Sequence, residues 1–433
     1  MHSCKNPKSR LETTGPVPSQ IKGKVAGFAA YGTAVNPNPN HVRTGTVAIV
    51  CFGLLLPAAS QTWTPTSAPT TNWLGIACSA DARTVIALAD FIYISTNSGS
   101  TWRATAPPNM QGAMRGIACS ADGTTIAASG WLNGVGMSAC VSTNLGSSWV
   151  VASAKYTSFT GHLASSADGS TLLLAGGDLQ ATGDKSPIFT SRDFGVTWIS
   201  NSTPKTDWRA VACSADGSTM VAVGAGQPIL TSKNYGGAWQ SNSTPAWGNW
   251  SAAACSPDGR SIIAGASASA WIYRTTDGGA TWTSNAFPQV PLFALACSAD
   301  GSRAVGVCYP GGIYTSSDSG VTWVSNGVPS KSWIGVASST DGAKLLAAAA
   351  LGDQVFASES VLSPLLNIQP SQTGARLSWC IPSSEFILEE NSYASPSNWT
   401  QSALSASFNL TNLHLEVSTP TLSEQRFYRL SQR

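Results

Sequence analysis

The sequence predicts an all-β protein: a seven-bladed β-propeller closed by its N-terminal strand, plus a small C-terminal β-sandwich. Three observations predict this fold. The phrase Ser-x-Asp-x-Gly-x-x-Trp, with substitutions, occurs six times at spacings of 41 to 49 residues, which is the length of one four-stranded blade. A second phrase, Ala-Cys-Ser-Ala-Asp-Gly and its variants, alternates with it and occurs seven times. No stretch of the 433 residues combines an apolar helical period with caps at both ends.

The first 60 residues have the character of a leader. Residues 1–60 contain six Lys or Arg and one Glu, whereas residues 61–433 contain 18 basic and 21 acidic residues. Thr46–Leu56 is an apolar stretch of signal-peptide length, too short to span a bilayer, and small residues follow it up to Ser60. We expect a signal peptide ending near Ser60, a secreted or cell-surface protein, and no integral membrane segment in the mature chain. The true start could lie near Val42, and an unusual cytosolic tail is the alternative.

Each repeat is expected to fold as four strands. An apolar first strand ends in Ala-Cys-Ser, and an Asp-Gly turn follows, where glycine tolerates a positive φ. The second strand is apolar, as in residues 219–224, and a loop of variable length leads to the third, as in residues 312–316. The Ser-x-Asp-x-Gly-x-x-Trp turn, called the box below, then leads to a fourth strand that begins at its tryptophan.

The seventh repeat is incomplete at its C-terminal end. Residues 355–360 hold its third strand, but no box glycine or tryptophan follows. Residues 62–73 resemble residues 238–250, with Trp63 in the place of a box tryptophan. The first strand of the mature chain is therefore expected to complete the last blade, which closes the ring and leaves no open edge.

The box is predicted to be a structural turn. Its serine and aspartate side chains can form hydrogen bonds across the hairpin, and its tryptophan buries a large apolar ring. Three boxes contain Asn97, Asn144 or Asn234 where the others have aspartate. An acid–base or metal role would not survive that exchange, but a turn would. The predicted structural residues are Ser95, Trp102, Trp149, Asp193, Trp198, Trp239, Asp277, Trp282, Asp318, Gly320 and Trp323.

These turns resemble the Asp-box, or BNR, repeats found in sialidases, sortilin-type receptors, xyloglucanases and photosystem II assembly factors. The resemblance covers residues 62 to about 358, most of the chain. The resemblance is specific for the propeller fold but says little about function. In that family the boxes lie on the face opposite the active site. The resemblance therefore implies that ligands meet the opposite face, called the ligand face below, which is formed by the loops between strands two and three and between blades.

The sequence disfavours a sialidase and makes an enzyme the less favoured interpretation. No Arg-Ile-Pro segment occurs, and no glutamate occurs between residues 61 and 358, so a sialidase Tyr-Glu pair cannot be assembled from the propeller. A glycoside hydrolase or lyase that uses ligand-face aspartates is the alternative. Asp90 and Asp353 share a register in neighbouring blades, and with Asp178 they are the catalytic candidates, although such a pair could also hold a cation. Solvated loop carboxylates are the simpler interpretation.

Aromatic residues outside the repeats give the positive evidence for a binding site. Trp131 and Trp247 fit neither register of the repeated tryptophans and fall in ligand-face loops. Exposed rings on one face suit stacking on sugars or contact with a protein, and packing within the loops is the alternative. The predicted ligand-binding residues are Trp131, Trp247, Asp207, Arg209, Tyr156, Phe159 and Tyr309.

Five cysteines and two serines share one register around the ring and therefore point the same way about its axis. Such positions are poorly placed to form disulfides, and a cysteine there behaves as a small buried apolar residue. We expect no disulfide framework, no metal site and no cofactor. The residues are Cys78, Cys119, Ser165, Cys213, Cys255, Cys297 and Ser338.

The residues after the propeller, which we expect to span 61–361, change in character. Six glutamates cluster from Glu359 onward, and residues 362–433 alternate as short strands. This segment resembles the small β-sandwich modules that end many secreted proteins of Verrucomicrobia and related bacteria, where it implies a sorting or adhesion appendage. The resemblance rests on Trp379, Phe386, Leu388, Trp399, Phe427, Tyr428 and Arg429.

Together these observations predict an exported, monomeric, non-catalytic binding or scaffold protein. It would engage a glycan or a protein through the ligand face. An assembly factor of the photosystem II type is a further alternative, which the scarcity of arginine on that face weakens. No basic stripe predicts nucleic-acid binding.

Overall fold

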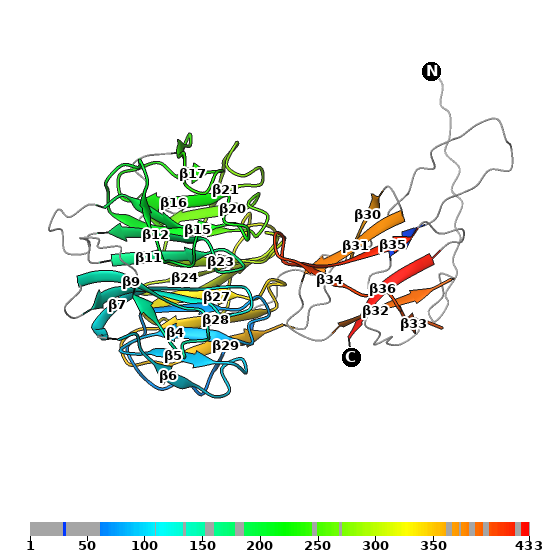
Figure 1. The fold of residues 1–433 in the computed structure, drawn as a ribbon, viewed down its shortest axis with the longest axis horizontal. Coiled ribbons are helices and arrows are strands. Elements are labelled where there is room, and N and C mark those ends of the chain that lie inside the picture. The colour runs from blue at the N-terminus through cyan, green and yellow to red at the C-terminus, as the bar shows by residue number, and fades with distance from the viewer. Residues whose placement is uncertain are drawn as a thin grey trace, which may run out of the picture.

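The computed structural model describes residues 29–31, 61–108, 110–132, 136–151, 160–177, 186–244, 249–267, 271–360, 366–371, 374–380, 386–392, 398–420 and 426–432. All regular elements in these ranges are β-strands (Figure 1), so the predicted all-β class is confirmed. Nowhere in these ranges is there a helix that could cross a membrane. Apart from residues 29–31, the predicted leader lies outside the described residues.

Residues 61–360 form seven four-stranded antiparallel sheets that follow one another around a central channel, and the predicted β-propeller is confirmed. In the first six sheets the innermost strand comes first and hairpins lead outward. The first three sheets are β3 (Gly75–Cys78), β4 (Val85–Leu88), β5 (Ile92–Ser95), β6 (Arg103–Thr105); β7 (Met110–Cys119), β8 (Ile126–Leu132), β9 (Gly136–Ser142), β10 (Val150–Val151); and β11 (Thr160–Ser165), β12 (Leu172–Gly177), β13 (Ile188–Ser191), β14 (Ile199–Ser200). The next three are β15 (Trp208–Cys213), β16 (Met220–Gly224), β17 (Leu230–Ser232), β18 (Gln240–Ser241); β19 (Trp250–Cys255), β20 (Ile262–Ala266), β21 (Trp271–Thr275), β22 (Thr283–Ala286); and β23 (Leu292–Cys297), β24 (Ala304–Cys308), β25 (Ile313–Ser316), β26 (Val324–Ser325).

The seventh sheet joins the two ends of the propeller chain. It contains β27 (Trp333–Ser338), β28 (Lys344–Ala349) and β29 (Val355–Glu359), and its outer strand is β2 (Thr64–Pro65). In this pairing Thr64 lies opposite Ala357 and Pro65 opposite Phe356. The chain segment that precedes the first sheet therefore supplies the outer strand of the last one.

Tryptophans fill the spaces between neighbouring blades. Four of them stand at or near the start of an inner strand and are at most 1% exposed. Trp208, for example, lies in one apolar cluster with Leu173 of the preceding blade and Met220 of its own. Each of these four tryptophans therefore couples its own blade to the preceding one. The four are Trp73, Trp208, Trp250 and Trp333.

The box holds its hairpin through one hydroxyl and one carboxylate. In the sixth box the Ser316 hydroxyl donates to Asp318 Oδ1 at 2.8 Å and accepts from the Gly320 N–H at 2.9 Å. Asp318 Oδ1 also accepts from the Thr322 N–H at 2.9 Å, and Trp323 Nε1 donates to the Gly320 carbonyl at 3.2 Å. Both side chains therefore satisfy backbone N–H groups that the tight turn would otherwise leave without partners.

Asparagine makes the same contacts where it replaces the box aspartate. Asn97 Oδ1 accepts from the Ser95 hydroxyl at 2.9 Å and from the Thr101 N–H at 2.8 Å. Its amide nitrogen donates to Thr101 Oγ1 at 2.9 Å, whereas the second carboxylate oxygen of Asp318 accepts from the corresponding threonine hydroxyl at 2.6 Å. Both residues therefore supply the acceptor oxygen that the turn needs.

Backbone hydrogen bonds link the Asp-Gly turns into a hoop around the channel. Because strands one and three of each blade run in the same direction, these turns lie on the same face as the boxes. Pro257 has no backbone N–H, so the step from Pro257 to Ala299 is missing. The N–H of the first residue of each pair donates to the carbonyl of the second at 2.7 to 2.8 Å. The pairs are Ala80 and Ala121, Ala121 and Ala167, Ala167 and Ala215, Ala215 and Pro257, Ala299 and Thr340, and Thr340 and Ala80.

The C-terminal residues form two further four-stranded sheets around their own core, called the module below. Trp379, Leu388 and Tyr428 are buried in it, and Arg429 stacks on Trp399 at 4.5 Å. Residues 29–31, which fall in the predicted leader, pair with its last strand. One sheet contains β30 (Asn367–Ser371), β31 (Gly374–Cys380), β35 (His414–Pro420) and β34 (Ser407–Asn409); the other contains β1 (Ala29–Tyr31), β36 (Arg426–Gln432), β32 (Phe386–Asn391) and β33 (Thr400–Gln401).

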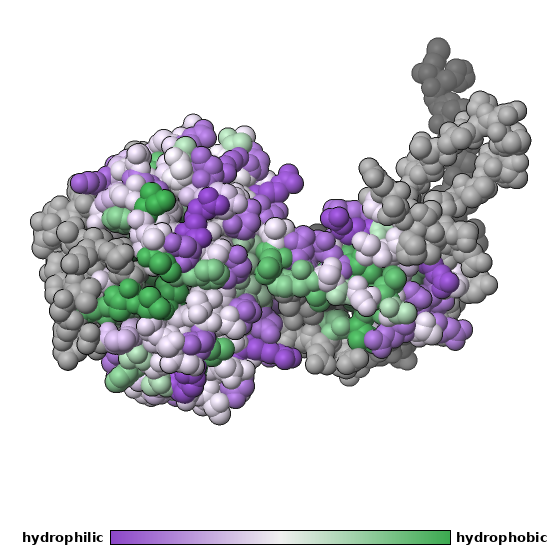
Figure 2. All heavy atoms as spheres, viewed as in Figure 1, coloured by the Kyte–Doolittle hydropathy of each residue, from purple (hydrophilic) through white to green (hydrophobic). Residues whose placement is uncertain are grey.

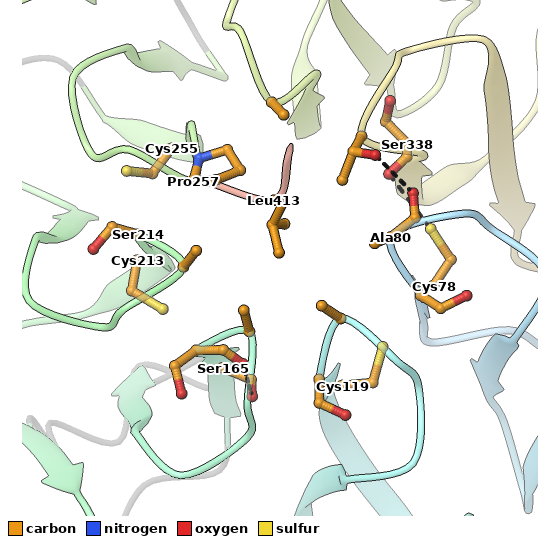
Figure 3. A pocket seen from close by; sticks show the side chains of 18 of the residues that line it. Cys78, Ala80, Cys119, Ser165, Cys213, Ser214, Cys255, Pro257, Ser338 and Leu413 are labelled. Carbon is orange, nitrogen blue, oxygen red and sulfur yellow. Dashed lines mark hydrogen bonds between the residues drawn. The ribbon is translucent and has the colours of Figure 1, made fainter. Parts of the chain in front are cut away.

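The turn between β34 and β35 joins the module to the propeller. Hydrophobic residues gather at this junction (Figure 2). Leu413 in this turn has a φ of 56° and is 9% exposed, in an apolar cluster with Ala167 and Ala215. Figure 3 shows Leu413 at the centre of the ring of Asp-Gly turns. The module therefore closes the channel on the box side, opposite the ligand face.

Candidate functional site

The closed end of the channel is a small cavity of about 190 Å³. Five cysteines and six serines are among the residues that line it, and Leu413 lies at its centre (Figure 3). Burial raises the pKa of Cys78, Cys213 and Cys297 to about 12, so these thiols stay protonated at neutral pH and are poor nucleophiles. In the described part of the chain no three His, Cys, Asp or Glu side chains are placed to hold a metal ion. The chemistry of this end therefore favours packing.

The ligand face instead carries a continuous run of contacts across the sixth, seventh and first sheets. We call it the aromatic band, because exposed rings stand at both of its ends, and a partly exposed ion pair and a buried indole connect them. Its members are Phe293, Tyr309, Lys331, Asp353, Trp73, Tyr93 and Phe91.

Two exposed rings form the end of the band on the sixth sheet. Phe293 in β23 is 45% exposed, and Tyr309, in the loop between β24 and β25, is 39% exposed. Their ring centroids lie 5.6 Å apart. Two hydrogen bonds between Gly311 and Lys331, of 3.0 and 3.1 Å, connect this loop to the next blade. The predicted position of Tyr309 on the ligand face therefore has a second aromatic residue beside it.

An ion pair between Lys331 and Asp353 forms the centre of the band. Lys331 Nζ also lies 4.9 Å from the centroid of the Phe356 ring, a favourable cation–π distance. The other Asp353 carboxylate oxygen accepts from the Gln354 N–H at 2.9 Å. The Asp353 carbonyl accepts from Trp73 Nε1 at 2.9 Å. Both carboxylate oxygens of Asp353 are therefore engaged inside the protein.

The other end of the band, on the first sheet, is built around Tyr93. Its ring packs edge-on against Trp73, with centroids 5.3 Å apart, and Phe91, which is 46% exposed, lies 6.4 Å away. The Tyr93 hydroxyl donates to Asp90 Oδ1 at 3.3 Å, and the Phe91 N–H donates to the same oxygen at 3.1 Å. Burial, followed by the charge of Asp90 and this hydrogen bond, raises the pKa of Tyr93.

The two carboxylates proposed as a catalytic pair serve separate partners. Asp353 forms an ion pair with Lys331, and Asp90 accepts a hydrogen bond from the Tyr93 hydroxyl. The ring contact between Trp73 and Tyr93 lies between these two carboxylates along the band. Within the described residues, neither an ion pair nor a shared hydrogen bond joins Asp90 to Asp353. Each carboxylate is therefore held by a hydrogen-bonding or ionic partner of its own.

A second polar cluster lies between the third and fourth sheets. Arg209 Nε donates to Asp207 Oδ2 at 2.9 Å, so these two predicted ligand-binding residues pair with each other. His162 in β11 is half-buried beside them. Burial, opposed by the Asp207 charge and reinforced by Arg209, lowers its pKa to about 4. His162 is therefore neutral at physiological pH.

The remaining predicted site residues have different outcomes. The predicted place of Trp131 in a ligand-face loop is wrong, because Trp131 lies within β8, opposite Ala113 in the ladder. The structure adds residues to the ligand face that the sequence did not single out. Each lies at or next to the end of a strand on that face, which was the available signal. The added residues are Phe91, Trp271, Phe293, Lys331 and Leu351, whereas Trp247, Asp178, Tyr156 and Phe159 lie outside the described residues.

Comparison with known proteins shows the fold. No protein-family model and no curated protein matches the chain. Among solved structures, YCF48 bound to D1 peptide is 15% identical with a TM-score of 0.51, covering 71% of this chain and 99% of that one. The GH74 enzyme of Niastella koreensis is 20% identical, with a TM-score of 0.53, over 68% of this chain and 44% of that one. The GH74 xyloglucanase from Xanthomonas campestris is 13% identical, with a TM-score of 0.54, over 74% and 59%. This chain thus matches less than two thirds of either GH74 protein.

Proposed function

We propose that this chain is an exported, non-catalytic binding or scaffold protein with a seven-bladed propeller of the Asp-box type. It engages a glycan or a protein through the aromatic band of the ligand face. One observation supports this function above the others: the band exposes the rings of Phe91, Phe293 and Tyr309 while its charged groups, Lys331 and Asp353, neutralise each other. Covering exposed rings releases free energy, whereas paired charges are withdrawn from acid–base chemistry.

Two alternatives remain as outcomes of the test. A glycoside hydrolase needs two carboxylates roughly 5–9.5 Å apart that face one pocket, and Asp90 and Asp353 are each held by a neighbour. The fold it shares with GH74 enzymes keeps hydrolysis as an outcome of the test. An assembly factor of the photosystem II type is the other alternative, and the YCF48 structure with its D1 peptide makes a peptide one class of ligand to try.

Binding by the full chain, residues 1–433, tests the proposal, because residues 29–31 supply a strand of the module. We expect a glycan array or a displayed peptide library to give a ligand whose affinity falls at least about tenfold in Phe293→Ala/Tyr309→Ala, because two exposed rings are removed. Phe408→Ala, a ring of the module that is 43% exposed, is the matched control and should bind as the wild type does. Cleavage of a bound glycan would favour the hydrolase, and a folded protein that binds neither class would contradict the proposal.

A further inference from the structure

The module takes one of its strands from the other end of the chain. Residues Ala29–Tyr31 form β1, which pairs antiparallel with β36, the last strand of the chain (Figure 1). In this pairing Ala29 lies opposite Tyr428, and Tyr31 lies opposite Arg426. The order of the sheet is β1-β36-β32-β33, so β1 covers the side of β36 that faces away from β32. The structure therefore shows what this edge accepts, which is a short, extended and uncharged segment of polypeptide.

The edge of β36 is longer than the strand that covers it. β36 has seven residues, Arg426–Gln432, and β1 pairs with the first three of them. On its other side β36 pairs with β32 from Phe427 to Gln432. In the described part of the chain, no strand lies opposite residues 429–432 on the β1 side. Backbone N–H and C=O groups along an uncovered edge are a template for another strand. The edge can therefore accept a longer strand than the one that occupies it.

The features that usually protect a sheet edge are missing from β36. Proline blocks pairing because it has no N–H, and β30, an end strand of the other module sheet, contains Pro370, whereas the sequence of β36 contains no proline. The outer strands of the seven blades have only two to four residues, and short edges are poor templates. Both arginines of β36 are held by glutamates of β32. Arg429 Nε donates to Glu389 Oε2 at 2.6 Å. Arg426 Nη1 lies 3.9 Å from Glu390 Oε1. Their charges are compensated within the sheet, so they do not exclude an incoming strand.

The module holds β36 in its paired shape from two other directions. Tyr428 and Leu430 are 3% and 6% exposed, in one apolar cluster with Leu388 and Val417. The ladder with β32 fixes the strand along six residues. A binding edge that is already ordered loses little conformational entropy when a partner adds to it. β36 therefore offers an ordered template that does not depend on β1 for its shape.

We propose that the β1 side of β36 is a strand-acceptor site, where an extended, uncharged segment of a protein partner adds to the sheet. Residues 29–31 occupy this site in the full chain. Main-chain hydrogen bonds supply the affinity, as in other complexes formed by strand addition. The inference goes beyond the proposed function, because its site lies on the module and not on the ligand face. One step rests on the proposed export: removal of a leader ending near Ser60 separates β1 from the chain and opens the site to the partner.

A full chain with a protease site inserted after Val42 tests the proposal. The chain is folded before it is cut, so the module does not have to fold without β1. The probe is a fluorescent peptide of residues 25–35, which carry no charged side chain, and its binding is followed by anisotropy. We expect the cut chain to bind the peptide at least about tenfold more tightly than the uncut chain, because β1 no longer competes from within the same chain. The same peptide with Ala30→Pro is the matched control and should not bind, since proline is excluded from a paired strand.

A second variant and a control at the ligand face complete the test. Full-chain Ala30→Pro, with a melting temperature that shows it to be folded, should also bind the unmodified peptide at least about tenfold more tightly than the wild type. Phe293→Ala/Tyr309→Ala should leave peptide binding unaltered, so failure of the ligand-face proposal and failure of this one are distinguishable. Equal binding of the two peptides, or no binding to the cut chain, overturns the acceptor site. Dimers of the cut chain in light scattering would assign the edge to a second copy and overturn it as well.

Discussion

Replacing Leu413 would measure how firmly the module is seated on the propeller. The side chain is 9% exposed, but its apolar neighbours Ala167 and Ala215 are small. Burial of a leucine contributes roughly 1.5–3 kcal/mol, so we expect Leu413→Ala to weaken docking by about 2 kcal/mol, at the low end for leucine truncation. The φ of 56° favours glycine over alanine here. Glycine relieves roughly 1 kcal/mol of strain that alanine retains, so Leu413→Gly should cost only about 1 kcal/mol.

Hydrogen exchange followed by mass spectrometry would detect this difference in peptides that span residues 404–416. A loss of about 2 kcal/mol corresponds to roughly thirty-fold faster exchange, and about 1 kcal/mol to roughly fivefold. Leu410→Ala changes an exposed leucine of the same turn and should leave exchange unaltered. Unchanged exchange in both Leu413 variants, or a larger effect of glycine than of alanine, would refute the role assigned to this residue.

Three further predictions concern the propeller itself. The pKa of His162 is about 4 in the folded state and 6.5 ordinarily, so the folded state binds fewer protons between these pH values. The free energy of unfolding should therefore fall as the pH drops from 6.5 to 4, by at most roughly 3 kcal/mol. Urea unfolding at several pH values should show a smaller pH dependence for His162→Gln than for the wild type, and an equal dependence would contradict the assignment. Asp318→Asn should change the free energy of unfolding by under about 0.5 kcal/mol, because Asn97 makes the equivalent bonds; a thermal-melt loss above about 1 kcal/mol would mean that the charge matters. Pro257→Ala adds an N–H that can donate to the Ala299 carbonyl and complete the ring of backbone hydrogen bonds. The stability gained from this hydrogen bond, about 1 kcal/mol, should be offset by the lost rigidity of proline. The new amide should exchange slowly with solvent, and rapid exchange would show that the hydrogen bond does not form.

The propeller was predictable because its determinants are local and repeated. The equivalence of Asn97 and Asp318 could be read from the repeat alone, and the hydrogen bonds of both boxes use the acceptor oxygen that they share. The likeness around Trp63 anticipated that the N-terminal segment would lie against the last blade, and β2 pairs with β29. These inferences were possible because equivalent positions of different repeats could be compared with one another.

The candidate site was only partly predictable, because it depends on contacts between residues that do not repeat. The register argument found Asp90 and Asp353, but it could not show that Lys331 and Tyr93 would engage them. Phe293 begins a strand like any other apolar residue, and only the packed structure shows its ring to be exposed. No sequence pattern indicated the position of Leu413, because the residues that surround its side chain come from turns that are distant from it in the chain.

The seating of Leu413 in the channel gives the molecule a front and a back. The module lies on the box side of the propeller, so the aromatic band is turned away from it. A molecule held on the band would therefore not have to share space with the module.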